Sequence, residues 1–141
     1  MSEDLKRTGG CLCGGVKFEV NLKEADVHIC HCDLCKKWAG GPSLSLMCED
    51  DWAITGEENL TWFDSSEWAQ RGFCNKCGTH LFGRVPAGDY RGVYAGALDS
   101  QDGLKINMHI FIDKKPSYYD FTDDAKRLTG DEFFAMVGES A

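Results

Sequence analysis

The sequence has little of several features that would direct it to a nucleic acid or a membrane. No apolar run in its 141 residues approaches the length that spans a bilayer. Fifteen basic residues stand against twenty-three acidic ones, which gives a net charge of −8, and the basic residues form no stripe or tail. Such a surface repels phosphate backbones, so we expect neither nucleic acid nor a membrane as a partner.

A secretion signal is also missing from the N-terminal residues. The segment Met1–Arg7 is polar and charged, with no apolar stretch behind it, so we expect a cytoplasmic protein. In a reducing compartment, clustered cysteines favour metal ligands or redox centres over structural disulfides. Cysteines two residues apart are in addition poor disulfide partners, because so small a ring is strained.

The pattern along the chain predicts short strands within one domain. Turn-forming residues and sixteen glycines separate apolar runs that alternate with polar residues. The predicted strands include Val16–Val20, Leu60–Phe63, Pro42–Cys48 and Ile106–Ile112. Helical signal is limited to Asp33–Ala39 and to Asp131–Val137, which we expect Gly138 to end. The fold class is therefore mainly β, with one or two short helices.

Seven of the eight cysteines lie in three tight clusters. The clusters are Cys11 with Cys13, then Cys30 with Cys32 and Cys35, then Cys74 with Cys77. Thiols spaced by one or two residues on a turn converge on a point, as tetrahedral zinc requires of its ligands. Seven sulfurs divide into four plus three, which predicts one closed structural zinc and one open zinc that can bind water or substrate.

The first and third clusters are expected to form the structural site together. Gly14 and Gly78 directly follow the last cysteine of each pair, where a metal-binding turn needs positive φ and directs backbone N–H groups at the sulfurs. Cys13 and Cys74 are 61 residues apart, so a shared zinc would close a long loop and stabilise the fold.

The middle cluster offers three sulfurs without an evident fourth ligand. His31 lies between two of its cysteines, and its side chain is expected to turn away from their common point. Cys48 is the other candidate, but a lone cysteine in a strand is more often a small buried hydrophobic residue. An open zinc held by Cys30, Cys32 and Cys35 is the simplest account.

These motifs resemble the glutathione-dependent formaldehyde-activating enzyme family, also called the CENP-V/GFA domain. The similar segments are Gly10–Phe18, Cys30–Lys37 with Gly41–Pro42, Arg71–Phe82, Gly96–Asp99 and His109–Phe111. The resemblance implies a β-tent fold of antiparallel sheets with a knuckle-bound structural zinc. It also implies a single domain over residues 1–141, with a family core at about 9–115 and a less diagnostic extension over 116–141.

The resemblance further implies roles for the cysteines and a reaction. Cys11, Cys13, Cys74 and Cys77 match the family's structural zinc site, and Cys30, Cys32 and Cys35 match its active-site zinc, so two zinc ions per chain are expected. The implied enzyme is a carbon–sulfur lyase that joins a glutathione-like thiol to an aldehyde such as formaldehyde. The chemistry agrees, because zinc with three thiolates is a weak activator of water but a suitable host for a fourth thiolate.

Two other functional classes remain open at this stage. One is a zinc-stabilised binding module without catalysis. The other is a thiol reductase, for which Cys48 is the one cysteine outside the clusters. The proton donor for the aldehyde oxygen is undecided among His28, His31, His80 and His109. We interpret Lys36, Lys37 and Arg71, beside the clusters, as solvated surface charges rather than as substrate ligands.

Overall fold

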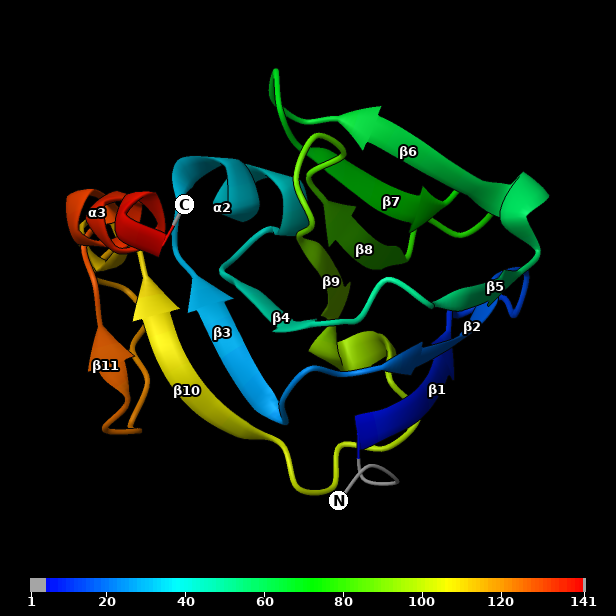
Figure 1. Cartoon of the computed structure of the whole chain (residues 1–141), viewed down its shortest axis with the longest axis horizontal. Coiled ribbons are helices and arrows are strands. Elements are labelled where there is room, and N and C mark those ends of the chain that lie inside the picture. The colour runs from blue at the N-terminus through cyan, green and yellow to red at the C-terminus, as the bar shows by residue number, and fades with distance from the viewer. Residues whose placement is uncertain (1–4, 141) are drawn as a thin grey trace. The chain divides into compact units, whose positions relative to one another are not determined.

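A computed structural model describes residues 5–140, with the backbone alone for residues 138–140 (Figure 1). The chain divides into two compact units. The first unit comprises the described residues up to Ala25 together with Ser45–Leu104, and the second comprises Asp26–Leu44 and the residues from Lys105 onward. No helix in the described part of the chain is long and apolar enough to cross a membrane. The single domain over residues 1–141 stays a prediction.

A three-stranded antiparallel sheet in the first unit carries the first pair of cysteines. Its strands are β1 (Lys6–Gly10), β2 (Lys17–Asn21) and β5 (Ala53–Thr55), in the order β1-β2-β5. Phe18 and Val20 of β2 are buried and Lys17 and Glu19 are exposed, which is the alternation that predicted this strand. The cysteine pair lies in the turn between β1 and β2.

A second group of antiparallel strands in the first unit carries the other pair. Its strands, in spatial order, are β4 (Ser43–Met47, paired through Ser45–Met47), β9 (Arg91–Tyr94), β8 (His80–Arg84), β7 (Gln70–Cys74) and β6 (Leu60–Asp64). Two short 3-10 turns adjoin these strands: η1 (Glu57–Asn59) comes directly before β6, and η2 (Ala95–Ala97) comes directly after β9. Phe82 of β8 is fully buried against the rings of Phe18, Trp52 and Trp62, which forms the aromatic core of this unit.

The second unit is built on parallel strands, unlike the antiparallel sheets expected from the resemblance. β3 (Asp26–Cys30) pairs in parallel with β10 (Lys105–Ile110), which pairs in parallel with β11 (Lys126–Arg127), as Figure 1 shows. The predicted strand over residues 106–112 ends at Ile110, because Phe111 adopts a φ of 56° and a 3-10 turn, η3 (Ile112–Lys114), follows. The mainly β fold class is confirmed, with sheets that are mixed rather than wholly antiparallel.

Two helices complete the second unit. α2 (Asp33–Ala39) has the predicted bounds and ends at Gly40, which has a φ of 81°. α3 (Gly130–Ser140) begins with a capping box: Thr129 Oγ1 accepts from the N–H of Glu132, and Glu132 Oε1 accepts from the N–H of Thr129. The predicted end of this helix at Gly138 is wrong, because glycine in a helix costs only about 1 kcal/mol and does not by itself stop one.

Candidate metal centres

The four sulfur atoms of Cys11, Cys13, Cys74 and Cys77 converge in the first unit. All lie within 4.8 Å of one another, with Cys13 Sγ 3.6 Å from Cys11 Sγ and 3.7 Å from Cys74 Sγ. The turn from β1 to β2 supplies one pair, and the end of β7 with the turn to β8 supplies the other. Four convergent thiols of this kind could hold one tetrahedral metal ion.

Backbone N–H groups surround these sulfurs as the glycine pattern predicts. The N–H groups of Gly15, Val16 and Lys76 donate to Cys13, Cys11 and Cys74 over 3.3 to 3.4 Å. Gly14 and Gly78 have φ of 78° and 80°, a region that glycine enters at little cost. The chain therefore reverses direction after each pair while its amide protons remain directed at sulfur.

Thr79 links the two turns and favours a thiolate at Cys77. Its Oγ1 lies 3.1 Å from Cys77 Sγ and accepts from the N–H of Leu12 in the opposite turn. Hydrogen bonds from Thr79 lower the pKa of Cys77 to about 5. A sulfur of this kind is ready to bind a cation at neutral pH.

The three sulfur atoms of Cys30, Cys32 and Cys35 converge separately, in the second unit. They also lie within 4.8 Å of one another, and Cys32 Sγ is 3.2 Å from Cys35 Sγ. Cys30 ends β3, Cys32 caps α2 by accepting the N–H of Cys35 at 3.3 Å, and Cys35 lies buried in the first turn of the helix. The Ser43 hydroxyl donates to Cys35 Sγ at 3.5 Å.

The close spacing of these thiols makes them hard to ionise without a cation. Hydrogen bonding with the neighbouring sulfurs of Cys32 and Cys35, together with burial, raises the pKa of Cys30 far above its ordinary value. A bound cation would lower the pKa of these thiols, since it would stabilise several thiolates at once. The donor set and its spacing therefore fit a metal ion that is bound through sulfur.

Neither candidate fourth ligand joins the three-cysteine cluster. His31 is fully buried and directs its ring nitrogens at Tyr119 and His109, over 2.9 Å each. Cys48 is also buried, it forms an isolated bridge with Leu22, and burial raises its pKa to about 12. Among the side chains that the structure describes, residues 5–137, this candidate metal site contains three cysteines and no further His, Cys, Asp or Glu.

Comparison with known proteins identifies the family. The sequence profile described as "Glutathione-dependent formaldehyde-activating enzyme" matches residues 6–114, which include all seven clustered cysteines. The chain belongs to this family.

Relatives of this glutathione-dependent formaldehyde-activating enzyme family cover the chain to different extents. A lyase of Schizosaccharomyces pombe, described as uncharacterized, is 29% identical over 92% of this chain and 95% of its own length. A protein of Talaromyces marneffei, provisionally named glutathione-dependent formaldehyde-activating enzyme, is 37% identical over 53% of this chain and 43% of its own length. A Rhodobacter sphaeroides protein of known crystal structure is 28% identical, with a TM-score of 0.53, over 70% of this chain and 90% of its own.

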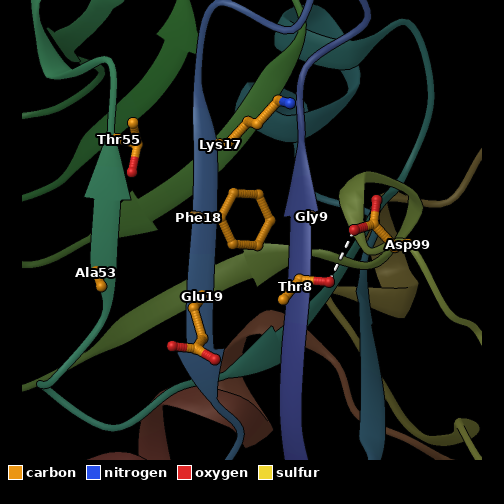
Figure 2. A pocket seen from close by; sticks show the side chains of 8 residues that line it. All are labelled: Thr8, Gly9, Lys17, Phe18, Glu19, Ala53, Thr55 and Asp99. Carbon is orange, nitrogen blue, oxygen red and sulfur yellow. Dashed lines mark hydrogen bonds between the residues drawn. The ribbon is translucent and has the colours of Figure 1, made fainter.

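A groove in the first unit has no cysteine among its lining residues. It is a groove of about 410 Å³ over the β1-β2-β5 sheet, and its lining residues are Thr8, Gly9, Lys17, Phe18, Glu19, Ala53, Thr55 and Asp99 (Figure 2). Thr8 Oγ1 donates to Asp99 Oδ2 at 2.8 Å, and the ring of Phe18 occupies the space beside Gly9 that a side chain would need. The groove holds neither a thiol nor an imidazole, so it offers nothing to the chemistry of the family.

Sequence reasoning missed a polar chain that begins beside the three-cysteine cluster. His109 contacts His31, and its Nε2 lies 3.0 Å from the carboxylate of Asp123. Both histidines were weighed one at a time as proton donors, but their pairing across 78 residues has no local signal in the sequence. Tyr119 and Asp123 lie beyond the family match, in the extension that the motifs left without a role.

The cations considered beside the clusters have partners on the protein. Lys36 donates to the carbonyl of Lys114 at 2.6 Å and lies 3.2 Å from the Asp33 carboxylate. The guanidinium of Arg71 donates to the hydroxyl of Tyr94 at 3.3 Å. Lys36 and Arg71 were interpreted from the sequence as solvated surface charges, and the structure shows instead that both side chains bond to groups of the protein.

Proposed function

We propose that this protein is a zinc-dependent carbon–sulfur lyase that forms or cleaves a thiol–aldehyde adduct, with S-hydroxymethylglutathione as the model substrate. The observation that carries the proposal is the cluster of Cys30, Cys32 and Cys35, whose sulfurs lie within 4.8 Å of one another without a fourth protein ligand in the described chain. The family description and the provisional names of the fungal relatives support glutathione and formaldehyde as the reactants.

Cys30, Cys32 and Cys35 would hold the active-site zinc. The protein fixes each sulfur differently, through the end of β3, the cap of α2 and the hydroxyl of Ser43. When bound there, zinc would lower the pKa of an incoming thiol and present its sulfur to an aldehyde carbon. Three thiolates make a site of this kind poor at activating water, so the same donor set argues against hydrolysis.

Cys11, Cys13, Cys74 and Cys77 would hold a second, structural zinc. Four sulfurs would complete a tetrahedral shell. The backbone N–H groups that donate hydrogen bonds to these sulfurs would offset the negative charge of the thiolates. No coordination position remains for a reactant. This site supports the fold of the first unit and does not take part in the reaction.

The binding of thiol is tested with cobalt in place of zinc, because cobalt reports its sulfur ligands through visible absorption. We expect glutathione to shift the sulfur-to-metal band as a fourth sulfur enters the shell. S-methylglutathione, which has no thiol, serves as the control and is expected to leave the band unchanged. The same band shift with both compounds would contradict coordination through sulfur.

Catalysis needs its own measurement, because formaldehyde and glutathione also combine without an enzyme. We expect the protein to accelerate exchange between free formaldehyde and S-hydroxymethylglutathione, and Cys32→Ser to abolish the acceleration. Cys48→Ala, outside both clusters, is the matched control and is expected to keep it. A band shift without faster exchange would retain the thiol site and reject the formaldehyde reaction, and the absence of both effects would favour a binding module.

A further inference from the structure

A buried serine side chain reaches the three-cysteine cluster from outside the segment that holds the cysteines. The Ser43 hydroxyl donates to Cys35 Sγ at 3.5 Å, and both residues are buried, with exposed fractions of 7% and 6%. A buried hydroxyl costs free energy unless it has a hydrogen-bond partner, and here the partner is a sulfur atom. Ser43 therefore contacts a residue that would hold the metal, without being a ligand itself.

The chain between α2 and β4 explains how Ser43 returns to the helix. α2 ends at Gly40, whose φ of 81° lets the chain reverse direction. Gly41 and Pro42 follow, and Ser43 begins β4. Ser43 therefore comes back to the first turn of the helix only eight residues after Cys35, and both residues belong to the second unit.

The hydrogen bond from Ser43 would persist when a metal binds. Cys32 Sγ also donates to Cys35 Sγ, at 3.2 Å, but a cysteine binds a metal without its S–H proton, so that bond would be lost. The serine hydroxyl keeps its proton and donates more strongly to a thiolate than to a thiol. The N–H of Cys35, which donates to Cys32 Sγ at 3.3 Å, would persist in the same way. Ser43 is thus a donor that a side-chain substitution can remove.

The charge of the cluster makes such donors important for the binding of a thiol. Three thiolates carry one more negative charge than zinc carries positive charge, and a fourth thiolate from a reactant would add another. Hydrogen bonds donated to the sulfurs spread this charge and lower the free-energy cost of the last thiolate. In the four-cysteine group, the N–H groups of Gly15, Val16 and Lys76 are donors of this kind.

We infer that Ser43 is a positioning residue for the reactant thiol: its hydrogen bond reduces the negative charge on Cys35 Sγ and so strengthens the binding of a fourth thiolate to the metal. The inference rests on the proposed function and adds a residue that sets the affinity for glutathione-like thiols. Ser43 acts through Cys35 and touches no reacting atom. Its hydroxyl keeps its proton throughout, so no proton transfer is involved.

The hydrogen bond itself is tested by NMR of the wild-type protein loaded with a magnetically active isotope of cadmium. We expect the Ser43 hydroxyl proton to exchange slowly with water and to couple to cadmium through the sulfur of Cys35. The absence of this coupling would overturn the inference. The result does not depend on the folding of any variant.

The effect on the metal is tested with cobalt bound to Ser43→Ala. Removal of the hydroxyl leaves the lone pairs of Cys35 at higher energy, so we expect the sulfur-to-metal band of the glutathione-free protein to move to longer wavelength. Ser43→Thr keeps a hydroxyl and should keep the wild-type band. Ser45→Ala removes a hydroxyl from the same strand and is the matched control. A role of Ser43 in packing alone would leave the band unmoved and would overturn the inference.

The affinity for thiol is measured by titration of the same cobalt proteins with glutathione. We expect Ser43→Ala to raise the Kd about tenfold, as the loss of a hydrogen bond to a metal ligand does. Ser43→Thr and Ser45→Ala should keep the wild-type Kd. An equally large rise in Ser43→Thr would overturn the inference, because the hydroxyl would then not be the cause.

These measurements separate the failure of this inference from the failure of the proposed function. A wild-type protein that binds glutathione at cobalt, with Ser43→Ala at the same Kd, would overturn the role of Ser43 alone, even if the band of the variant had moved. A wild-type protein whose cobalt band does not respond to glutathione would overturn the thiol site of the proposed function, and this inference with it.

Discussion

At the scale of single residues, the cysteines differ in what surrounds each sulfur. Cys74 is fully buried, and its sulfur accepts a hydrogen bond from the N–H of Lys76. Its neighbour Cys13 lies on the other turn of the same site. Cys35 is also buried, but its site draws every ligand from residues 30–35. The two buried thiols are therefore expected to differ in what their loss does to the fold.

Replacement of one cysteine at each site tests this difference. We expect Cys74→Ser to destabilise the protein by several kcal/mol, because the loss of a structural zinc removes folding free energy directly and small domains hold little in reserve. Cys35→Ser should lower the melting temperature much less and abolish the response to glutathione. Thermal melts of both variants make the comparison, and equal losses would assign a structural role to both sites.

Cys48 is the residue on which a thiol-reductase function would depend. It is 1% exposed, and its raised pKa keeps it as a thiol, which does not suit a nucleophile. We expect Cys48→Ala to cost about 1 kcal/mol of stability, as the loss of a small buried side chain does, and to leave adduct exchange unchanged. Chemical denaturation measures the change in stability, and exchange rates measure the effect on the reaction. Loss of exchange in a folded variant would contradict the assignment.

At the scale of elements, the cysteine turns depend on two glycines with positive φ. Nothing lies within 4 Å of the position that a Cβ would take at Gly78, so a substitution there meets only the strain of the backbone at a φ of 80°. We expect Gly78→Ala to cost about 1 kcal/mol and to speed the loss of metal from the four-cysteine site. Thermal melts and the rate of release to a chelator report the effect.

Gly96→Ala is the matched control for this prediction. Gly96 belongs to the same unit and also has open space around its Cβ position, but its φ is not positive. We expect Gly96→Ala to leave the stability of the protein unchanged or to raise it slightly, since alanine reduces the entropy of the unfolded chain. A similar loss for both variants would contradict the role of positive φ at Gly78, because both positions have open space for a Cβ.

The elements also show how far sequence patterns reach. Alternation of apolar and polar residues located β2 and β6, and the spacing of the cysteines located the groups that the structure brings together. Alternation depends on neighbours along the chain, so it could not show that β3 and β10 pair in parallel across 79 residues of sequence at Asp26 and Lys105. The link between His31 and His109 follows from that pairing, and it was missed for the same reason.

At the scale of the whole molecule, each group of cysteines lies within one compact unit. The four-cysteine group belongs to the first unit and the three-cysteine group to the second. The first group joins segments that are 61 residues apart, whereas the second involves a single turn between β3 and α2. A metal in the first site therefore closes a long loop, and a metal in the second closes almost none.

This difference predicts two zinc ions of unequal lability. The open site has three ligands that are close in sequence, and its fourth position is available to a competing chelator, so its zinc should leave first. The four-cysteine zinc can leave only when the turns of β1–β2 and β7–β8 separate, which requires local unfolding of the first unit. We expect mild chelation to remove about one zinc per chain, to abolish the glutathione response, and to change the melting temperature little, as measured by metal analysis and thermal melts on the same samples. Release of both ions in one step, together with unfolding, would contradict the division into a structural site and a reactive one.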